Sequence, residues 1–246
     1  IVSGPPTDRV IRAFNNVRFY KTDMSGKCDS LHSSTKNELT QLIGKPVLWN
    51  NENQMTGDLM HLIGNNETEK LDSLKVLNNA FIIQKDSLSK NGFNQMKGQN
   101  LFGRFEENKL KEVDIIKNAE SIYYIYNDKN EFVGIRKSVC SRINLEMNEN
   151  KIETMTGFNN TESNIYPDNE FPENARKLRG FAWRGDERIL SKENIFPEEE
   201  LAIDAKVQID AKKKAIESEK PMEIQKETLE YDEKNPKPKD KTVKKQ

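Results

Sequence analysis

The sequence has few of the residues from which catalytic and metal centres are usually built. Its 246 residues include two cysteines and two histidines. Neither Cys28 nor Cys140 belongs to a CxxC pair or a His/Cys cluster, and a structural zinc site needs about four such ligands. His32 and His61 stand apart from any nucleophile motif such as GxSxG. We therefore expect no metal, no cofactor and no enzyme activity. We also expect two partly buried free thiols, although export would allow a disulfide between them.

Long apolar runs and an excess of one charge are also missing. No stretch approaches the ~20 apolar residues that cross a bilayer as a helix. The net charge is −1, with both signs interspersed, so bulk electrostatics favours neither nucleic acid nor a membrane surface. Only 34% of the residues are hydrophobic and 32% are charged. This balance suits a narrow dry interior with much solvated surface.

What the sequence does have is a short motif that occurs more than once, called the repeated phrase below. Asn-Gln-Met, one further residue and then Gly occur twice, and two weaker versions surround other glycines. The return of one phrase after tens of residues indicates an architecture built from similar coils. Each glycine is expected where a strand bends or another backbone comes close. The stretches are "DMSGKCDSL" (23–31), "ENQMTGDL" (52–59), "FNQMKGQNL" (93–101) and "NEFVGIRKS" (130–138).

A second phrase places a turn pair before a short β-rich run, and residues within these runs alternate. Val17 and Phe19 flank Arg18, for example. Period-two alternation means one dry and one wet face of a strand. Short strands separated by Gly and Asn turns predict an all-β sandwich, barrel or solenoid. Irregular spacing argues against a strict parallel β-helix. The four runs are "FNNVRFY" (14–20), "IGKPVLW" (43–49), "LNNAFII" (77–83) and "IKNAESIYY" (116–124).

The order of these motifs resembles a known family. "VRFYKTDMSGKCDSL", "KPVLWNNENQMTGD", "NNAFIIQKDS", "FNQMKGQNLFGRF" and "LRGFAWR" are similar to the OstA-like proteins of Bacteroidetes. These are relatives of the lipopolysaccharide-transport proteins LptA and LptC and of the N-terminal part of LptD. The resemblance extends over residues 10–196. It implies the C-terminal half of a longer protein and an all-β fold, a repetitive antiparallel V-shaped β-jellyroll.

The resemblance also implies a function. It predicts a periplasmic or outer-membrane-associated module that carries lipopolysaccharide, with the lipid A acyl chains in an apolar groove. Methionines suit a surface that fits flexible chains, and each buried acyl CH₂ contributes about 0.8 kcal/mol. The residues predicted to face the groove are Val17, Phe19, Met24, Val47, Trp49, Met55, Leu59, Leu74, Val76, Ile82, Met96, Phe102, Val113, Ile115 and Tyr123.

Composition divides the chain into three parts. Residues 1–165 carry the β-jellyroll pattern, 166–197 a Pro-punctuated segment, and 198–246 a short helix followed by a charged disordered tail. The middle segment predicts a cap that covers the open end of the sheet. An alternative is a basic and aromatic surface for lipid phosphates or a partner, formed by Phe181, Trp183 and nearby arginines. The open edge at Val10–Tyr20 is expected to pair with another β-jellyroll module of the transport bridge.

A short Asp-Ser-Leu motif occurs three times. It matches the signal for O-glycosylation of exported proteins in Bacteroidetes, which predicts glycans on Ser30, Ser73 or Ser87. Ordinary turn chemistry explains the motif equally well.

Two other functions stay open. A structural or adhesive β-repeat protein would have the same alternation around a closed core. A polysaccharide-active β-solenoid enzyme would need two carboxylates facing each other across a polar cleft. A deep apolar groove favours transport over both.

Overall fold

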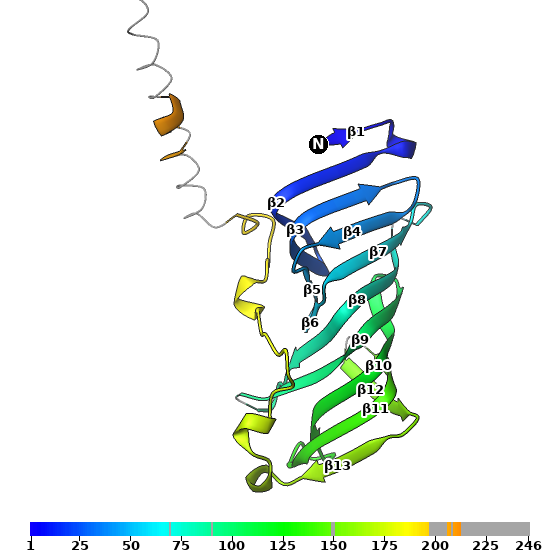
Figure 1. Cartoon of the computed structure of the whole chain (residues 1–246), viewed down its shortest axis with the longest axis vertical. Helices are drawn as coiled ribbons and strands as arrows, with labels where there is room; N and C mark the ends of the chain where they lie inside the picture. Colours follow the sequence, from blue (N-terminus) through cyan, green and yellow to red (C-terminus); the bar gives the residue numbers. More distant parts are fainter. Residues whose placement is uncertain (69, 90, 149–150, 197–205, 208, 213–246) are drawn as a thin grey trace, which may run out of the picture. The chain divides into compact units, whose positions relative to one another are not determined.

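Antiparallel strands join into one continuous sheet, in which neighbours along the chain are mostly neighbours in space. The computed structural model describes residues 1–68, 70–89, 91–148, 151–196, 206–207 and 209–212. Within these residues the sheet has 13 strands in the order β1-β2-β3-β4-β7-β8-β9-β10-β11-β12, with β5, β6 and β13 beside this path. Figure 1 shows the strands stacked from β1 at one end of the sheet to β13 at the other.

The strand bounds show that long and short strands mix. They are β1 (Val2–Ser3), β2 (Val10–Lys21), β3 (Met24–Ser34), β4 (Leu39–Ile43), β5 (Val47–Asn50), β6 (Asn53–Thr56), β7 (Leu59–Asn65), β8 (Lys70–Lys85), β9 (Phe93–Glu106), β10 (Lys109–Tyr126), β11 (Phe132–Asn148), β12 (Lys151–Phe158) and β13 (Glu162–Tyr166).

Pairs of left-handed residues fold this sheet along a line. Consecutive positive φ angles at five places mark this line: within β2, β8 and β10, between β4 and β5 and between β12 and β13. A sixth pair, Glu107–Asn108, is the hairpin turn between β9 and β10. Asparagine is favoured there because its short side chain tolerates the left-handed region that most residues avoid. The four predicted turn pairs are confirmed; the fifth pair was not predicted. The five pairs on this line are Asn15–Asn16, Gly44–Lys45, Asn78–Asn79, Lys117–Asn118 and Asn159–Asn160.

Each of these five pairs is a corner at which the chain passes from one wall to another. The ladders break there, between Phe14 and Val17 of β2 and between Leu77 and Ala80 of β8. The residues before the corner of β2 and β8 belong to one wall and the residues after it to the other. The first wall comprises 10–14, 30–34, 39–43, 59–65, 70–77, 100–106, 109–116, 142–148 and 151–158. The second comprises 17–21, 24–28, 47–50, 53–56, 80–85, 93–98, 119–126, 132–140 and 162–166.

The predicted all-β, V-shaped β-jellyroll is therefore confirmed, with the apolar faces of both walls turned toward each other. Two of the four recurring glycines, Gly57 and Gly98, lie beside its corners. A Cβ atom on Gly98 would lie 2.6 Å from the Ile115 side chain and 3.0 Å from the carbonyl oxygen of Ile116. Glycine is needed there because another strand passes close by.

A continuous apolar core fills most of the space between the walls. Its members come from both walls and are almost entirely shielded from solvent. This burial is the main force that holds the V together, at roughly 1.5–3 kcal/mol for each fully buried aliphatic side chain. The fully buried members include Leu42, Leu48, Met55, Met60, Leu74, Val76, Leu101, Val113, Ile115 and Leu145.

A second apolar cluster lies on the outer face of the second wall. Residues 167–195, called the strap below, cross this face from the end of β13 toward β2, and appear in yellow in Figure 1. The strap contains three short 3-10 turns, Asp168–Glu170, Glu173–Ala175 and Gly185–Glu187. Strap residues Phe171 and Leu178 are buried against Phe81 and Ile83 of β8. The predicted cap is therefore wrong in position, because the segment covers a face of the sheet instead of its end.

The strap is fastened to the second wall by a glutamine from the repeated phrase. The Gln54 side chain is fully buried. Its Nε2 donates a hydrogen bond to the carbonyl oxygen of Ala182 at 2.7 Å. Its Oε1 accepts one from the backbone N–H of Arg184, also at 2.7 Å. The amide therefore pairs with the strap as a neighbouring strand would.

Gln95 repeats this contact. Its Nε2 donates to Arg176 O at 2.7 Å, and its Oε1 accepts from Leu178 N at 2.9 Å. The next residue in each phrase, Met55 or Met96, points into the core between the walls. The Asn-Gln-Met-x-Gly motif therefore occurs twice because each copy has the same three roles. Its glutamine points outward and bonds the strap, its methionine points inward into the core, and its glycine lies near the corner.

The strap also contains the basic and aromatic residues that suggested a lipid-phosphate surface. Phe181 and Trp183 pack on Phe93, with ring centroids 5.2 Å from its own in each case. Arg184 bonds Glu187 at 2.8 Å, and Arg176 bonds Asp168 at 2.7 Å. These side chains are used to hold the strap, so the alternative of a free basic–aromatic surface loses its support.

The body Ile1–Ile195 is one compact unit, which takes in both the β-jellyroll and the strap, and Phe196–Gln246 is a second. Within the second unit the residues 206–207 and 209–212 are helical, in agreement with the predicted helix. The predicted disordered tail lies outside the described residues. In the part of the chain that the structure describes, no helix is both long and apolar enough to span a bilayer.

Candidate functional site

A groove opens between the two walls at the β2 end of the sheet. It has a volume of about 1030 Å³, at the upper end of the range for small-molecule pockets. Its apolar lining comes mostly from the inner faces of β2, β3, β7 and β8 and includes Ile11, Ala13, Val17, Phe19, Met24, Leu31, Leu62 and Leu71, and Leu39 borders it from the tip of β4.

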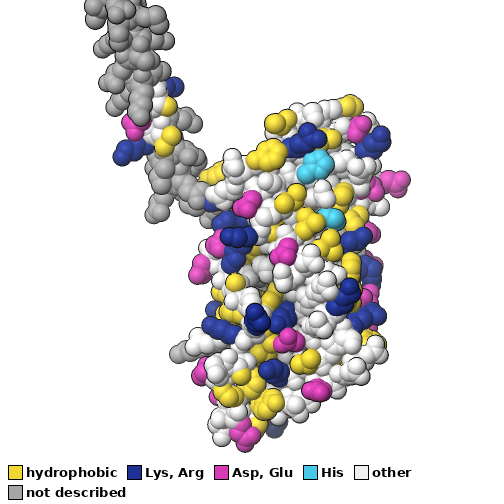
Figure 2. Space-filling view, viewed as in Figure 1, with side chains coloured by type: hydrophobic (Ala, Val, Ile, Leu, Met, Phe, Trp, Pro, Cys, Tyr) yellow, Lys and Arg dark blue, Asp and Glu magenta, His cyan; other side chains and the backbone are white. Residues whose placement is uncertain are grey.

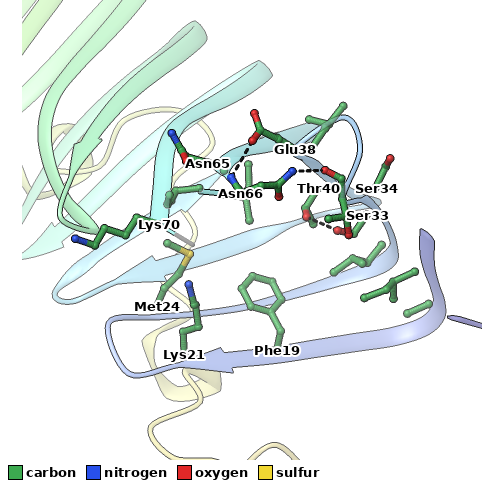
Figure 3. A pocket seen from close by; sticks show the side chains of 18 of the residues that line it. Phe19, Lys21, Met24, Ser33, Ser34, Glu38, Thr40, Asn65, Asn66 and Lys70 are labelled. Carbon is green, nitrogen blue, oxygen red and sulfur yellow. Dashed lines mark hydrogen bonds between the residues drawn. The ribbon is translucent and has the colours of Figure 1, made fainter. Parts of the chain in front are cut away.

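The groove is open because the core is incomplete at this end. Val17, Phe19 and Leu31 pack against the core but stay partly exposed, whereas Leu42 and Leu48, which lie deeper, are fully buried. Phe19 lies over Gly26 of the neighbouring strand, where a Cβ atom would come within 2.4 Å of its ring. Gly26 therefore allows the Phe19 ring to form part of the groove floor. Figure 3 shows Phe19 and Met24 on the strands that border this space.

The rim of the groove is polar and held by local hydrogen bonds. Ser33 and Thr40 share one between their hydroxyl groups at 2.7 Å. The backbone N–H of Asn66 donates to Glu38 Oε1 at 2.8 Å, and its side chain donates to the carbonyl oxygen of Thr35 at 2.7 Å. Dashed lines in Figure 3 mark these bonds. The tip of the first wall is therefore ordered beside an apolar opening.

Cations also border the groove. Arg18, Lys21 and Lys70 are among its lining residues. Lys70 forms an ion pair with Glu107, and Arg18 donates to the carbonyl oxygen of Ile195 in the strap at 3.0 Å. An apolar channel with basic residues at its margin fits an amphipathic anion better than a neutral hydrocarbon.

Of the fifteen predicted groove residues, eleven face inward and divide into three sets. Val17, Phe19 and Met24 line the open groove. Tyr123 lies on the inner side of β10 at the other end of the sheet, with the guanidinium of Arg136 6.0 Å from its ring centroid. A further set faces inward but lies in the filled core, without access to the groove: Met55, Leu74, Val76, Ile82, Met96, Val113 and Ile115.

Four residues predicted to face inward point the other way. In β5 it is Leu48 that enters the core between the walls, so Val47 and Trp49 lie on the outer face. Trp49 is the cross-strand neighbour of Gln54, which bonds the strap. Leu59 and Phe102 are outward because Met60 and Leu101 are the buried inner residues. Apolar character alone did not reveal direction for Val47 and Trp49, since this protein buries apolar side chains on both faces of its second wall, nor for Leu59 and Phe102, which are partly buried on the outer face of the first wall.

Sequence reasoning missed most of the actual lining. Leu31 of β3 pairs with Leu42 of β4, and Leu62 of β7 pairs with Thr40 of β4, so Leu31 and Leu62 lie in neighbouring rows of the same inner face. Leu71 follows a register shift in the β7–β8 ladder. The only signal in the sequence was the alternation of "LHS" and "LIG", which is too short to assign a face.

The three Asp-Ser-Leu motifs lie in different surroundings. Ser30 and Ser73 are half-buried within paired strands, and Ser73 has strand partners on both sides. Ser87 is exposed in the connection between β8 and β9. Asp86, which precedes it, accepts hydrogen bonds from Ser89 N at 2.8 Å and from the Tyr126 hydroxyl. Glycosylation stays a prediction, with Ser87 the most accessible of the three hydroxyl groups.

Both cysteines are free and buried. Burial raises the pKa of the Cys28 thiol to about 11, which keeps it protonated and unreactive. Among the residues that can be described, no three His, Cys, Asp or Glu side chains gather where a metal ion could bind.

A second, polar cavity of about 770 Å³ lies at the corner line, beside β6, β8, β9 and β10. It contains the carboxylates of Asp58 and Glu120. Asp58 accepts a hydrogen bond from Asn79 Nδ2 at 2.9 Å, and Glu120 forms an ion pair with Lys97 at 3.0 Å. Both carboxylates therefore have structural partners, and the cavity offers little support for a glycosidase.

The edge expected to pair with another module is partly covered by the chain itself. β1 pairs with Val10 and Ile11 of β2, and the N-terminal ammonium group of Ile1 donates to Arg12 O at 2.7 Å. The expectation of a free edge is wrong for this part of β2. Over 19–21, the ladder pairs β2 with β3 on one side, and pairing of this part with another module stays a prediction.

The fold and the groove together define a β-jellyroll with an apolar channel that opens at one end. No protein-family model matches the chain, and no curated protein matches it. A solved structure with a similar backbone path is that of LptH from Pseudomonas aeruginosa, which is described as the LptA homologous periplasmic component of the conserved lipopolysaccharide transport device. The similarity has a TM-score of 0.44 at 13% sequence identity and covers 60% of this chain and all of the LptH chain.

Proposed function

We propose that this chain is a periplasmic lipopolysaccharide-binding module that shields acyl chains in the groove at the β2 end. The module would pass the lipid along a bridge of similar β-jellyrolls that leads to the outer membrane. The observation that carries the proposal is an open apolar groove in a sheet whose interior is otherwise filled.

The chemistry of the groove suits acyl chains. Its walls carry aliphatic and aromatic side chains, and Met24 adds a flexible surface that adapts to an irregular ligand. Each CH₂ group that leaves water contributes about 0.8 kcal/mol, so several methylenes from one chain suffice for measurable binding. No step needs a nucleotide or a metal, so the direction of transport would come from partner proteins.

The polar rim supports an amphipathic ligand. A lipid with its acyl chains in the groove would present its headgroup where Arg18, Lys21 and Lys70 lie. Phosphate groups of lipid A are suitable partners for such cations.

A photocrosslinking experiment tests the proposal. A benzophenone side chain placed at Phe19 or Leu31 should crosslink to lipopolysaccharide, whereas one at Val133, an exposed apolar position in β11, should not. Phe19→Asp should lower capture at a second site, Leu31, while Val133→Asp leaves it unchanged. Equal crosslinking from all three positions, or none from Phe19 and Leu31 in folded protein, would overturn the proposal.

A structural or adhesive β-repeat protein is the second candidate. It is favoured by the filled core from β8 to β12, which leaves most of the inner faces without room for a ligand. In that case Phe19→Asp would alter stability without any change in lipid binding.

A further inference from the structure

The outer face of the first wall has an unusual composition over its first five strands. Three cross-strand rows cover β2, β3, β4, β7 and β8, and together they are called the β2–β8 face below. The row nearest the corners is Phe14–Ser30–Ile43–Leu59–Leu77, the middle row is Arg12–His32–Gln41–His61–Lys75, and the outer row is Val10–Ser34–Leu39–Ile63–Ser73.

These rows contain no carboxylate, although the chain has 40 Asp and Glu residues. Arg12 and Lys75 have no ion-pair partner among the residues that the structure describes. His61 has its pKa lowered by burial and by Lys75, so it stays neutral near pH 7. The face therefore carries uncompensated positive charge from Arg12 and Lys75. The nearest acids lie beside the rows, at the corners and the strand tips.

The row nearest the corners is apolar and partly open to solvent. Phe14 is 58% exposed and Ile43 is 43% exposed, and Leu59 and Leu77 are half-buried beside them. Figure 2 shows both histidine side chains on the side turned to the viewer, among yellow apolar and dark-blue basic side chains. An apolar stripe beside a basic row is the arrangement that interfacial proteins present to lipid.

The other half of the same wall is different. Over β9–β12 the corresponding rows contain Glu112, Asp114 and Glu146. Arg142 pairs with Asp114 at 2.7 Å, and Arg104 lies 3.4 Å from Glu112. This half contains carboxylates and pairs two arginines with them, so the lack of carboxylates is not a general property of the wall.

We propose that the β2–β8 face docks on the surface of a bilayer that contains anionic lipids. The apolar row would enter the boundary between headgroups and acyl chains, and the basic row would lie among the headgroup phosphates. The absence of carboxylates from the three rows removes the repulsion that acidic side chains would meet at an anionic surface. Docking goes beyond the proposed function and does not require a lipid in the groove.

Docking would also bring the groove close to the lipid bilayer. The same five strands carry the groove lining on their inner faces. A wall that rests on a membrane would hold the open end of the groove beside the lipids.

Vesicle co-sedimentation tests the inference. The full chain should bind vesicles of phosphatidylcholine with phosphatidylglycerol, and added salt should weaken the binding because the phosphate contacts are screened. Binding to pure phosphatidylcholine should be weaker. The double variant Phe14→Ser and Ile43→Ser should lower partitioning about tenfold, from the loss of apolar burial. Arg12→Gln with Lys75→Gln should lower it on the anionic vesicles alone.

Phe158→Ser is the matched control. Phe158 is 40% exposed and lies on the same outer face of the first wall, at the β12 end of the row nearest the corners. The guanidinium of Arg142 lies 5.1 Å from the centroid of its ring. The Phe158→Ser variant should bind vesicles like the unmodified chain. Circular dichroism melts should show every variant folded. The inference is overturned if the unmodified chain stays in the supernatant with anionic vesicles, which is the result expected if the face binds a protein instead. It is also overturned if Phe158→Ser loses as much vesicle binding as the double variant. Lipid capture at Leu31 is measured separately, so its failure would refute the proposed function and leave docking untouched.

Discussion

The glutamine contact between the second wall and the strap gives the sharpest prediction about stability. In Gln54→Ala, the strap loses both hydrogen bonds of this side chain, and Ala182 O and Arg184 N lose their partner. Each hydrogen bond contributes about 0.5–1.5 kcal/mol, and a buried polar group without a partner costs about 1–3 kcal/mol. Because the strap has room to relax toward water, we expect the free energy of unfolding to fall by about 2–4 kcal/mol.

Two further variants separate the hydrogen bonds from the volume of the side chain. Gln54→Met keeps a similar volume but makes neither bond, so it should lose nearly as much as alanine. Gln54→Glu still accepts from Arg184 N but does not donate to Ala182 O, and it also buries a charge. It should therefore be no more stable than Gln54→Met, although it differs from the native residue by one group.

The measurement is urea unfolding followed by tryptophan fluorescence, since Trp183 lies in the strap and Trp49 beneath it. Limited proteolysis should cut the strap earlier in all three variants. Gln99→Ala is the control, because Gln99 is exposed near the corner of β9. A loss below about 0.5 kcal/mol in Gln54→Ala, close to the effect expected of an exposed site, would refute the view that these amides fasten the strap.

Three other outcomes follow from single groups. Hydrogen bonds from Arg184, and then from Lys27, lower the pKa of Glu187 to about 2. Its contribution to stability should be complete above pH ~4.5 and disappear as the pH falls toward 2, and Glu187→Gln should flatten that part of the melting curve. The effect should stay below ~1 kcal/mol because the carboxylate is 38% exposed. Cys28 and Cys140 should react with a thiol reagent only after unfolding, because both are buried; rapid labelling of the native protein would contradict the closed interior. Asn118 has φ of 54°, so Asn118→Val should cost about 1–2 kcal/mol while Asn118→Gly costs little, as thermal melts would show.

The sequence by itself determined the fold class. Alternating residues such as Val17 and Phe19 gave strands with one dry face, and the Asn and Gly pairs gave corners at the right places. These signals are local, since strand direction and left-handed φ angles depend on a few neighbouring residues. For the same reason Val17, Phe19 and Met24 could be assigned to the inner surface before the walls were known.

The assignment of faces in the second wall depended on tertiary structure. All four residues of β5, Val47–Asn50, are buried, because the core covers one face of the wall and the strap covers the other. Alternation of polar and apolar residues distinguishes a solvent-exposed face of a strand from a buried one, so it cannot assign direction when both faces are buried. This is why Val47 and Trp49 were given the wrong direction, and why the role of Gln54 was invisible in the sequence.

The groove and the β2–β8 face also arise only when the strands assemble. Whether inward side chains meet a filled core or an opening depends on how many strands stack beyond them, so Ile82 and Phe19 look alike in sequence but differ in access. A net charge of −1 describes the whole chain, whereas strand register places Arg12 and Lys75 at the two ends of one row on a face whose three rows lack carboxylates. The pattern of residues within each strand can therefore be read from the sequence. The surfaces that contact ligands combine residues from strands that are far apart along the chain.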